Sequence, residues 1–125
     1  MEYGFIKVAS AVPVVHVADC EKNTDEIKSL MVKAESQRAE IVVFPELCIT
    51  GYSCQDLFGQ QFLLDRAETY LMHIIDFSKQ YKVISIVGLP VIVGNLLLNC
   101  AVVIQHGNIL GLVPKTYLPN YNEFY

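Results

Sequence analysis

Two spacings of apolar residues follow one another along this chain, and each predicts one kind of secondary structure. Mostly apolar runs at 5–12, 41–44 and 83–89 have the length and the β-branched content of buried strands. In the segments 23–38 and 61–81 apolar residues recur every three to four positions, as on one face of an amphipathic helix. The pattern therefore predicts the order strand, helix, strand, helix, strand.

The two predicted helices have assignable buried faces, and the first has an assignable start. Asn23 with Glu26 three residues later resembles a capping box, so we expect the first helix to begin at Asn23 and to run to about Arg38. Its expected buried face consists of Ile27, Leu30, Met31 and Ala34. The expected buried face of the second helix consists of Leu63, Leu64, Ala67, Leu71, Ile74, Ile75 and Ser78.

After residue 89 the pattern predicts strands with no helix between them. Apolar runs lie at 91–93, 96–105 and 109–113, and Gly107-Asn108 between the last two is a two-residue hairpin signal. The fold class is therefore predicted to be α/β with a mixed sheet. Two right-handed βαβ crossovers give the sheet a parallel start, and antiparallel strands follow.

The chain is more apolar than its length requires. Of its 125 residues 53% are hydrophobic, against about 45–50% in ordinary soluble domains, and the mean hydropathy is +0.37. One explanation is a sheet that is buried on both faces. The other is apolar surface covered by further chain or by a partner subunit. Composition leaves both explanations open.

Charge and composition exclude several classes of function. The net charge is −4 without a Lys/Arg cluster, which argues against nucleic-acid binding. The longest apolar region, 83–98, is broken by Ser, Gly, Pro and Asn, so we expect no membrane span. The start of the chain does not resemble a signal peptide, and we expect a cytoplasmic protein with reduced thiols. No cysteine has the spacing of a metal ligand, so no metal is expected.

Three ionisable residues lie where chemistry could be placed. Glu46 comes just after the buried run 41–44, and ligands of α/β folds bind beyond the carboxyl ends of strands. Lys115 follows the last predicted strand, and Glu123 lies eight residues further on. A carboxylate of this kind can act as a general base, and a lysine can stabilise an oxyanion. The ordinary alternative is that these residues are a turn cap and solvated edge charges.

A nucleophile is the missing part of such a site. Cys48 and Cys54 lie close to Glu46 in sequence, but neither has a basic neighbour that would favour a thiolate. We expect buried, unreactive thiols at these positions. His16, His73 and His106 lack the Ser, Cys and Asp context of a catalytic triad.

Two segments resemble a known family. FPELCITGY at Phe44–Tyr52 and NCAVVIQHGNILGLVPKTYLPNYNEFY at Asn99–Tyr125 are similar to the first two catalytic blocks of the nitrilase superfamily of carbon–nitrogen hydrolases. Within it, KTYLPNYNEFY is most similar to the N-terminal glutaminase domain of glutamine-dependent NAD+ synthetases. The resemblance covers nearly the whole chain.

The resemblance implies a fold and a set of site residues. Residues 1–125 would be the N-terminal portion of a carbon–nitrogen hydrolase domain, half of an αββα sandwich, with the chain stopping inside the domain. Glu46 would be the general base and Lys115 the lysine that stabilises the tetrahedral intermediate. Glu123 would support the site, and Tyr52 and Tyr121 would bind glutamine. The family's nucleophilic cysteine belongs to a later block that this chain does not contain.

The resemblance also implies a reaction and partners. The parent protein would hydrolyse glutamine and pass ammonia to a C-terminal synthetase domain that uses ATP and Mg2+ on deamido-NAD+, while the amidase part needs no cofactor. A homo-oligomer is expected, and strands and helix faces would pack on chain that is absent here. The alternatives are another nitrilase-type amidase acting on a different small amide, and a non-enzymatic α/β binding module.

Overall fold

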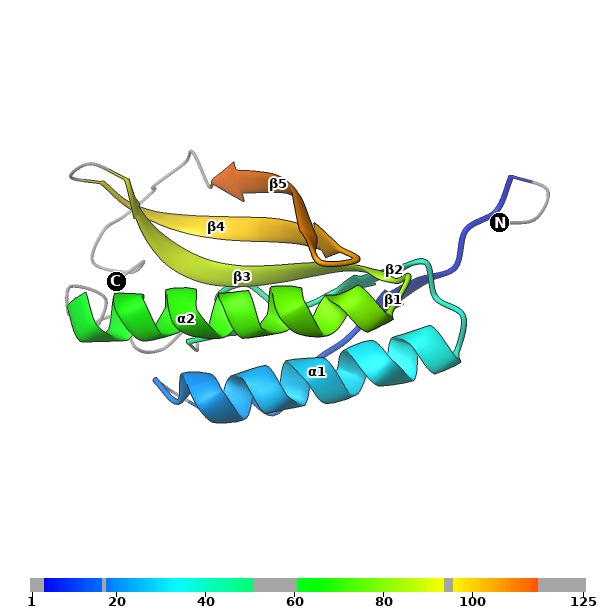
Figure 1. Ribbon diagram of the computed structural model, residues 1–125, viewed down its shortest axis with the longest axis horizontal. Coiled ribbons are helices and arrows are strands. Elements are labelled where there is room, and N and C mark those ends of the chain that lie inside the picture. Colours follow the sequence, from blue (N-terminus) through cyan, green and yellow to red (C-terminus); the bar gives the residue numbers. More distant parts are fainter. Residues whose placement is uncertain (1–3, 17, 51–60, 94–95, 115–125) are drawn as a thin grey trace.

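The computed structural model describes residues 4–16, 18–50, 61–93 and 96–114. Strands and helices follow one another in the predicted order (Figure 1). The elements are β1 (Val8–Ser10), α1 (Cys20–Ser36), β2 (Ile41–Val43), α2 (Gln61–Phe77), the 3-10 turn η2 (Ser78–Gln80), β3 (Ile84–Val93), β4 (Leu96–Gln105) and β5 (Asn108–Pro114). None of the helices in these described ranges is long and apolar enough to cross a membrane.

The strands form one mixed sheet in the order β1-β2-β3-β4-β5. β1, β2 and β3 are parallel, with Val42 of β2 paired to Ala9 on one side and to Ser85 on the other. β3, β4 and β5 are antiparallel. The predicted parallel start and antiparallel continuation are both confirmed.

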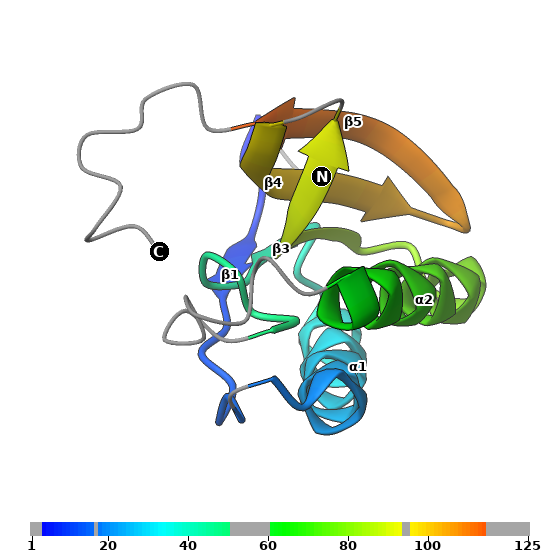
Figure 2. The ribbon, with the colours of Figure 1, turned by 90° about the vertical axis from the view of Figure 1, so that its left-hand side faces the viewer.

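Both helices lie on the same face of the sheet (Figure 2). α1 and α2 pack against each other, and their buried side chains meet those of β2, β3 and β4 in one hydrophobic core. The predicted faces are confirmed: all seven positions predicted for the second helix are buried, six in α2 and Ser78 in η2, as are three of the four predicted for α1, with Leu30 partly buried. Fully buried members of this core include Ile27, Met31, Ile74, Val42, Val87 and Val102.

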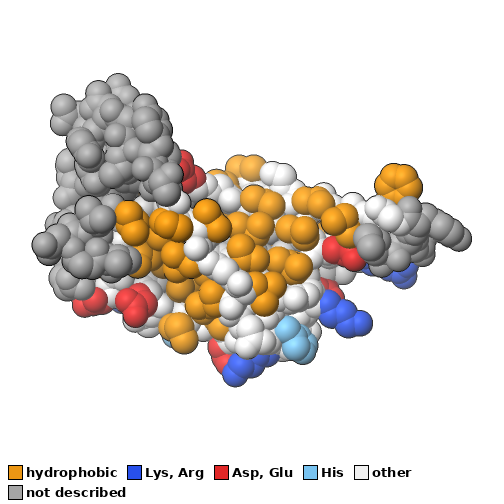
Figure 3. All heavy atoms as spheres, turned by 90° about the horizontal axis from the view of Figure 1, so that it is seen from above, with side chains coloured by type: hydrophobic (Ala, Val, Ile, Leu, Met, Phe, Trp, Pro, Cys, Tyr) orange, Lys and Arg blue, Asp and Glu red, His pale blue; other side chains and the backbone are white. Residues whose placement is uncertain are grey.

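The opposite face of the sheet carries exposed apolar side chains. Val42 of β2 is completely buried against the helices, whereas Val43, which points the other way, is 38% exposed. Figure 3 shows apolar side chains gathered over this face. Burial of the sheet on both faces is therefore not observed within the described residues. The expectation that the helix faces would pack on absent chain is wrong, because this chain's own sheet covers them. In the described part of the sheet, the exposed large apolar side chains are Val8, Val43, Ile109, Leu110, Leu112 and Val113.

The first helix begins earlier than the sequence pattern predicted. α1 starts at Cys20, and its N-cap is Asp19, whose side chain accepts a hydrogen bond from the backbone N–H of Lys22 at 3.1 Å. Asn23 is not a cap. Asn23 lies in the first turn of α1, and its side chain is buried. Its amide nitrogen donates to the backbone carbonyls of His16 and Ile49 at 2.7 and 2.8 Å. A side chain that satisfies local backbone groups looks the same in sequence whether it caps a helix or ties down a loop.

Strand boundaries also differ from the prediction. β1 is only three residues long, at the edge of the sheet. The hairpin turn is His106-Gly107, one residue earlier than predicted, and both residues have positive φ, 53° and 83°. A two-residue turn of this kind matches the twist of the flanking strands.

β3 continues through Pro90, where the sequence pattern placed a break. The carbonyls of Ile86 and Gly88 accept hydrogen bonds from Phe44 and Ile49, so these positions of β3 face the β2 side. Pro90 has the same parity and faces that side too. Its missing N–H therefore removes no bond to β4, and the antiparallel pairing of Pro90 with Asn99 persists.

The two methionines at 31 and 72 provide a test of the core. Met31 of α1 is fully buried and Met72 of α2 is 56% exposed. We expect Met31→Ala to lower the free energy of unfolding by about 2–5 kcal/mol, because a cavity adds to the lost burial. Met72→Ala should change it by less than about 0.5 kcal/mol. Urea unfolding measures both, and equal effects would contradict the assigned core.

Candidate functional site

Glu46 is the outward-facing residue of a segment that is otherwise buried. β2 ends at Val43, and the chain then runs beside β3, where the N–H of Phe44 donates to the carbonyl of Ile86 at 3.0 Å and that of Ile49 to the carbonyl of Gly88 at 3.2 Å. Leu47, Cys48, Ile49 and Thr50 are each at most 1% exposed, whereas Glu46 is exposed. The packing of residues 47–50 therefore fixes the direction in which the side chain of Glu46 points.

Gly88 allows this segment to lie directly on β3. A Cβ atom at Gly88 would be 2.6 Å from the backbone nitrogen of Leu47, closer than real Cβ contacts allow. Cys48 adds a second tie: its Sγ accepts from the N–H of Gly88 at 3.4 Å, and its thiol donates to the carbonyl of Gly88 at 3.8 Å. Leu47 has a φ of 54°, an uncommon left-handed conformation for a leucine. Tight packing holds the chain in this bend.

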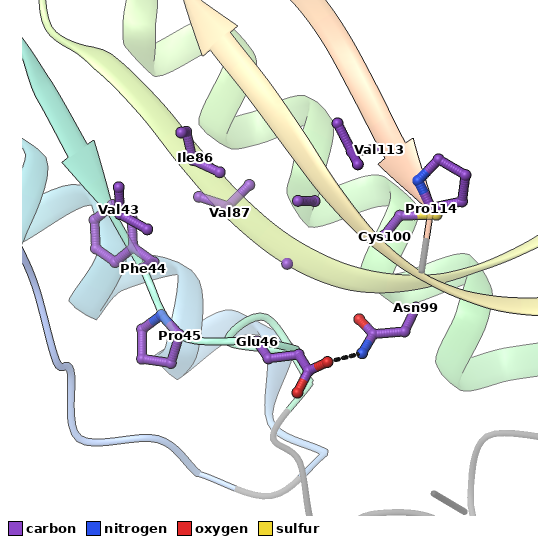
Figure 4. Close-up of a pocket in the computed structure, with 12 residues that line it drawn as sticks. Val43, Phe44, Pro45, Glu46, Ile86, Val87, Asn99, Cys100, Val113 and Pro114 are labelled. Carbon is purple, nitrogen blue, oxygen red and sulfur yellow. Dashed lines mark hydrogen bonds between the residues drawn. The ribbon is translucent and has the colours of Figure 1, made fainter. Parts of the chain in front are cut away.

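The carboxylate lies at one end of a hollow on the open face of the sheet. The hollow has a volume of about 350 Å³. Asn99 of β4 points toward Glu46, and its Nδ2 donates a hydrogen bond to Oε1 of Glu46 (Figure 4). The lining residues are Val43, Phe44, Pro45, Glu46, Ile86, Val87, Gly88, Asn99, Cys100, Ala101, Val113 and Pro114. The hollow is thus an apolar space with one acid–amide pair at its end.

The thiols near this hollow are not set up as nucleophiles. Burial raises the pKa of Cys48 to about 11, with the hydrogen bond from Gly88 acting in the opposite direction. Burial also raises the pKa of the Cys100 thiol. No lysine, arginine or histidine lines the hollow within the described ranges. These findings agree with the expectation that Cys48 is a buried, unreactive thiol.

The structure places one of the predicted site residues and adds another. Glu46 is described, whereas Lys115, Glu123, Tyr52 and Tyr121 lie outside the described residues, as does Cys54. The last described residue of β5, Pro114, lines the hollow. Among the described residues no group of three His, Cys, Asp or Glu side chains could hold a metal ion.

Asn99 was missed by the sequence reasoning. The residue opens the second of the two segments that resemble catalytic blocks, which is the signal that could have drawn attention to it. Its partner, however, lies 53 positions away along the chain. Only the pairing of β4 with β3 brings Asn99 and Glu46 to the same end of the hollow.

The sequence of this chain is similar to a known family of enzymes. The family model for carbon–nitrogen hydrolase matches residues 7–124. A glutamine-dependent NAD(+) synthetase of Mycobacterium tuberculosis is 36% identical over 124 residues, which are 99% of this chain and 18% of that protein. The chain therefore spans about a fifth of the length of such relatives.

Solved structures share the fold. A glutamine-dependent NAD(+) synthetase from Cytophaga hutchinsonii superposes with a TM-score of 0.85 at 30% identity, over 92% of this chain and 20% of that one. An amidase from Nesterenkonia sp. superposes with a TM-score of 0.73 at 23% identity, over 92% of this chain and 44% of that one, a likeness of fold alone. A related structure of the Nesterenkonia amidase shows acrylamide added at its active site cysteine.

Two strand glycines test the close approach beside Glu46. We expect Gly88→Ala to lower the free energy of unfolding by about 1–3 kcal/mol, because the new methyl group overlaps the backbone of Leu47. Gly111→Ala in β5 is the matched control, since a Cβ there meets nothing within 4 Å. Urea unfolding of both variants checks this, and a neutral Gly88→Ala would contradict the assigned packing.

Alkylation tests the burial of Cys48. With a pKa of about 11 the thiol stays protonated at pH 8, so iodoacetamide should modify it much more slowly than in urea-unfolded chain. Because the native pKa lies above the ordinary value of 9.0, the thiol contributes stability below pH 9 that is lost as the pH rises through 11. Peptide mass spectrometry measures the labelling. Equal rates in native and unfolded protein would refute the buried assignment.

Proposed function

This chain belongs to the carbon–nitrogen hydrolase family, and we propose that residues 1–125 are the first part of a glutaminase domain. The parent protein would hydrolyse the side-chain amide of glutamine. The observation that carries the proposal is the position of Glu46, a carboxylate at the end of a hollow on the open face of the sheet. Glutamine is proposed as the substrate because the relatives are named glutamine-dependent NAD(+) synthetases.

In the proposed reaction Glu46 is the general base. It accepts the proton of a cysteine thiol, and the thiolate attacks the amide carbon of glutamine. Lys115 stabilises the oxyanion of the tetrahedral intermediate. The carbon–nitrogen bond then breaks, Glu46 returns the proton to the leaving ammonia, and water hydrolyses the thioester to release glutamate. The cysteine would come from chain beyond Tyr125, because the thiols described near the hollow, Cys48 and Cys100, are buried.

The remaining residues of the proposed site would bind and support. Tyr52 and Tyr121 would contact glutamine, and Glu123 would support the site. These assignments rest on the family resemblance of the segments around them. The end of β5 at Pro114, on the wall of the hollow, supports placing Lys115 in the same site as Glu46.

The relatives also support a partner domain. Because they are about five times as long as this chain, we propose a C-terminal synthetase domain that uses ATP and Mg2+ to convert deamido-NAD+ to NAD+ with the released ammonia. No residue described here is assigned to ATP or Mg2+. We further propose that the parent protein forms a homo-oligomer in the cytoplasm.

A second candidate is a different small-amide hydrolase, which the match to the carbon–nitrogen hydrolase family also accommodates. The two candidates differ in what the parent gene encodes after the cysteine block. A synthetase domain there supports NAD+ synthesis, and a stop codon soon after that block supports the amidase. The third alternative, a binding module without catalysis, predicts that the wild-type parent protein hydrolyses no amide.

Glutamine hydrolysis by the parent protein tests the proposal. We expect Glu46→Gln to reduce kcat by about 10²–10⁴-fold, because a neutral amide cannot accept the thiol proton. Glu68→Gln, at an exposed position of α2, is the control with the same change of charge. The 125-residue chain alone should release no measurable glutamate.

Two outcomes would contradict this scheme. Full activity in Glu46→Gln would show that Glu46 is not the general base. Activity of the 125-residue chain that disappears in Cys48→Ala would assign the nucleophile to a thiol that is buried and whose pKa burial raises to about 11.

A further inference from the structure

Asn99 makes a side-chain hydrogen bond to the carboxylate of Glu46, and this bond joins two distant parts of the fold. Asn99 lies on β4, paired with Pro90 of β3, and is only 5% exposed. Its Nδ2 donates to Oε1 of Glu46, which comes from the bend after β2 (Figure 4). A buried strand residue thus holds the exposed acid at the end of the hollow.

We propose that Asn99 is a positioning residue that orients the carboxylate of Glu46 for proton transfer. The proposal rests on the function proposed above, in which Glu46 is the base. A general base works only when its oxygen lies within hydrogen-bonding distance of the proton it takes, and a displacement of about 1 Å can cost 10²-fold in rate. Packing fixes the backbone of residues 47–50, but the flexible side chain of Glu46 needs a partner of its own.

The chemistry of an amide suits this task. The N–H of asparagine donates without bringing a charge, so it orients the carboxylate without forming an ion pair that would lower its basicity. A carboxylate has two oxygens and about four lone-pair positions, so one amide hydrogen bond leaves capacity to accept a proton. An aspartate at the same position would have the same shape, but it would repel the base.

Burial makes the donor rigid. Asn99 lies in a strand that is paired on both sides, with β3 and with β5, and its side chain is almost inaccessible. Donors that are already oriented need no reorganisation during the reaction. Gly88, on the strand between the two partners, has no side chain and lets the backbone at Glu46 approach β3. The hydrogen bond between Asn99 and Glu46 therefore depends on the packing of the bend after β2, of β3 and of β4.

A purely structural role is the competing explanation. A buried amide requires a hydrogen-bond partner, and Glu46 could serve only to satisfy Asn99. The two explanations differ in what is lost when the amide is replaced. A structural role predicts lower stability with the kinetics of folded protein unchanged, and a positioning role predicts a lower kcat in protein that is still folded.

The test uses the full-length parent protein with two replacements at Asn99. Asn99→Leu removes the donor at similar size, and Asn99→Asp replaces the donor by an acceptor. We expect kcat for glutamine hydrolysis to fall about tenfold to hundredfold in both, with KM changed by less than about twofold. Asn108→Asp, at an exposed position of β5 next to the hairpin turn, is the matched control and should keep wild-type kcat.

Crystal structures of the variants make the test independent of activity. We expect the carboxylate of Glu46 to leave its position in Asn99→Leu and Asn99→Asp, while the backbone of residues 44–50 stays in place. A carboxylate that stays in position, or a kcat that is unchanged in folded variants, would overturn the proposal. Loss of activity that only follows loss of folded protein, measured by thermal unfolding, would also overturn it.

The outcomes separate this proposal from the proposed function. If wild-type protein does not hydrolyse glutamine, or if Glu46→Gln keeps full activity, the proposed function fails, and the proposal about Asn99 fails with it. If Glu46→Gln is inactive and both Asn99 variants are as active as wild type, the function stands and only the positioning role is lost.

Discussion

The close approach of two backbones at Gly88 is the constraint on which the arrangement around Glu46 depends. The bend after β2 can lie on β3 only because position 88 has no side chain. The hydrogen bonds of Cys48 and Ile49 to Gly88 then fix the bend, and the burial of residues 47–50 leaves Glu46 to face the hollow. Cys48, which lies so close to the acid in sequence, is therefore part of the buried contact with β3.

Much of the fold could be predicted from the chain because its main signals are local. The apolar faces of α1 and α2 are visible in a single period of about 3.6 residues, and the sheet they cover buries nearly all of those positions. The succession of strands and helices along the chain could be predicted from the same pattern. The position of Glu46 after a buried strand could also be predicted, because a strand end is a local feature.

What could not be predicted depends on contacts between distant residues. Asn23 carries the local signal of a cap, but a carbonyl at Ile49, 26 positions away, makes it a buried tie between the helix and the loop. Pro90 indicates a strand end, but its orientation toward the β2 side lets β3 continue. The pairing of Asn99 with Glu46 has no local signal at all, since strand register alone brings the two residues together.

The long separation between Asn99 and Glu46 has a consequence for how the protein is made. β1, α1 and β2 lie within the first 43 residues and can come together early, whereas contacts between distant residues form later because chain closure costs entropy first. Until β4 has paired with β3, the acid at position 46 has no amide to meet. On a growing polypeptide the carboxylate is therefore synthesised before its partner emerges, and the hydrogen bond between Asn99 and Glu46 is a late product of folding.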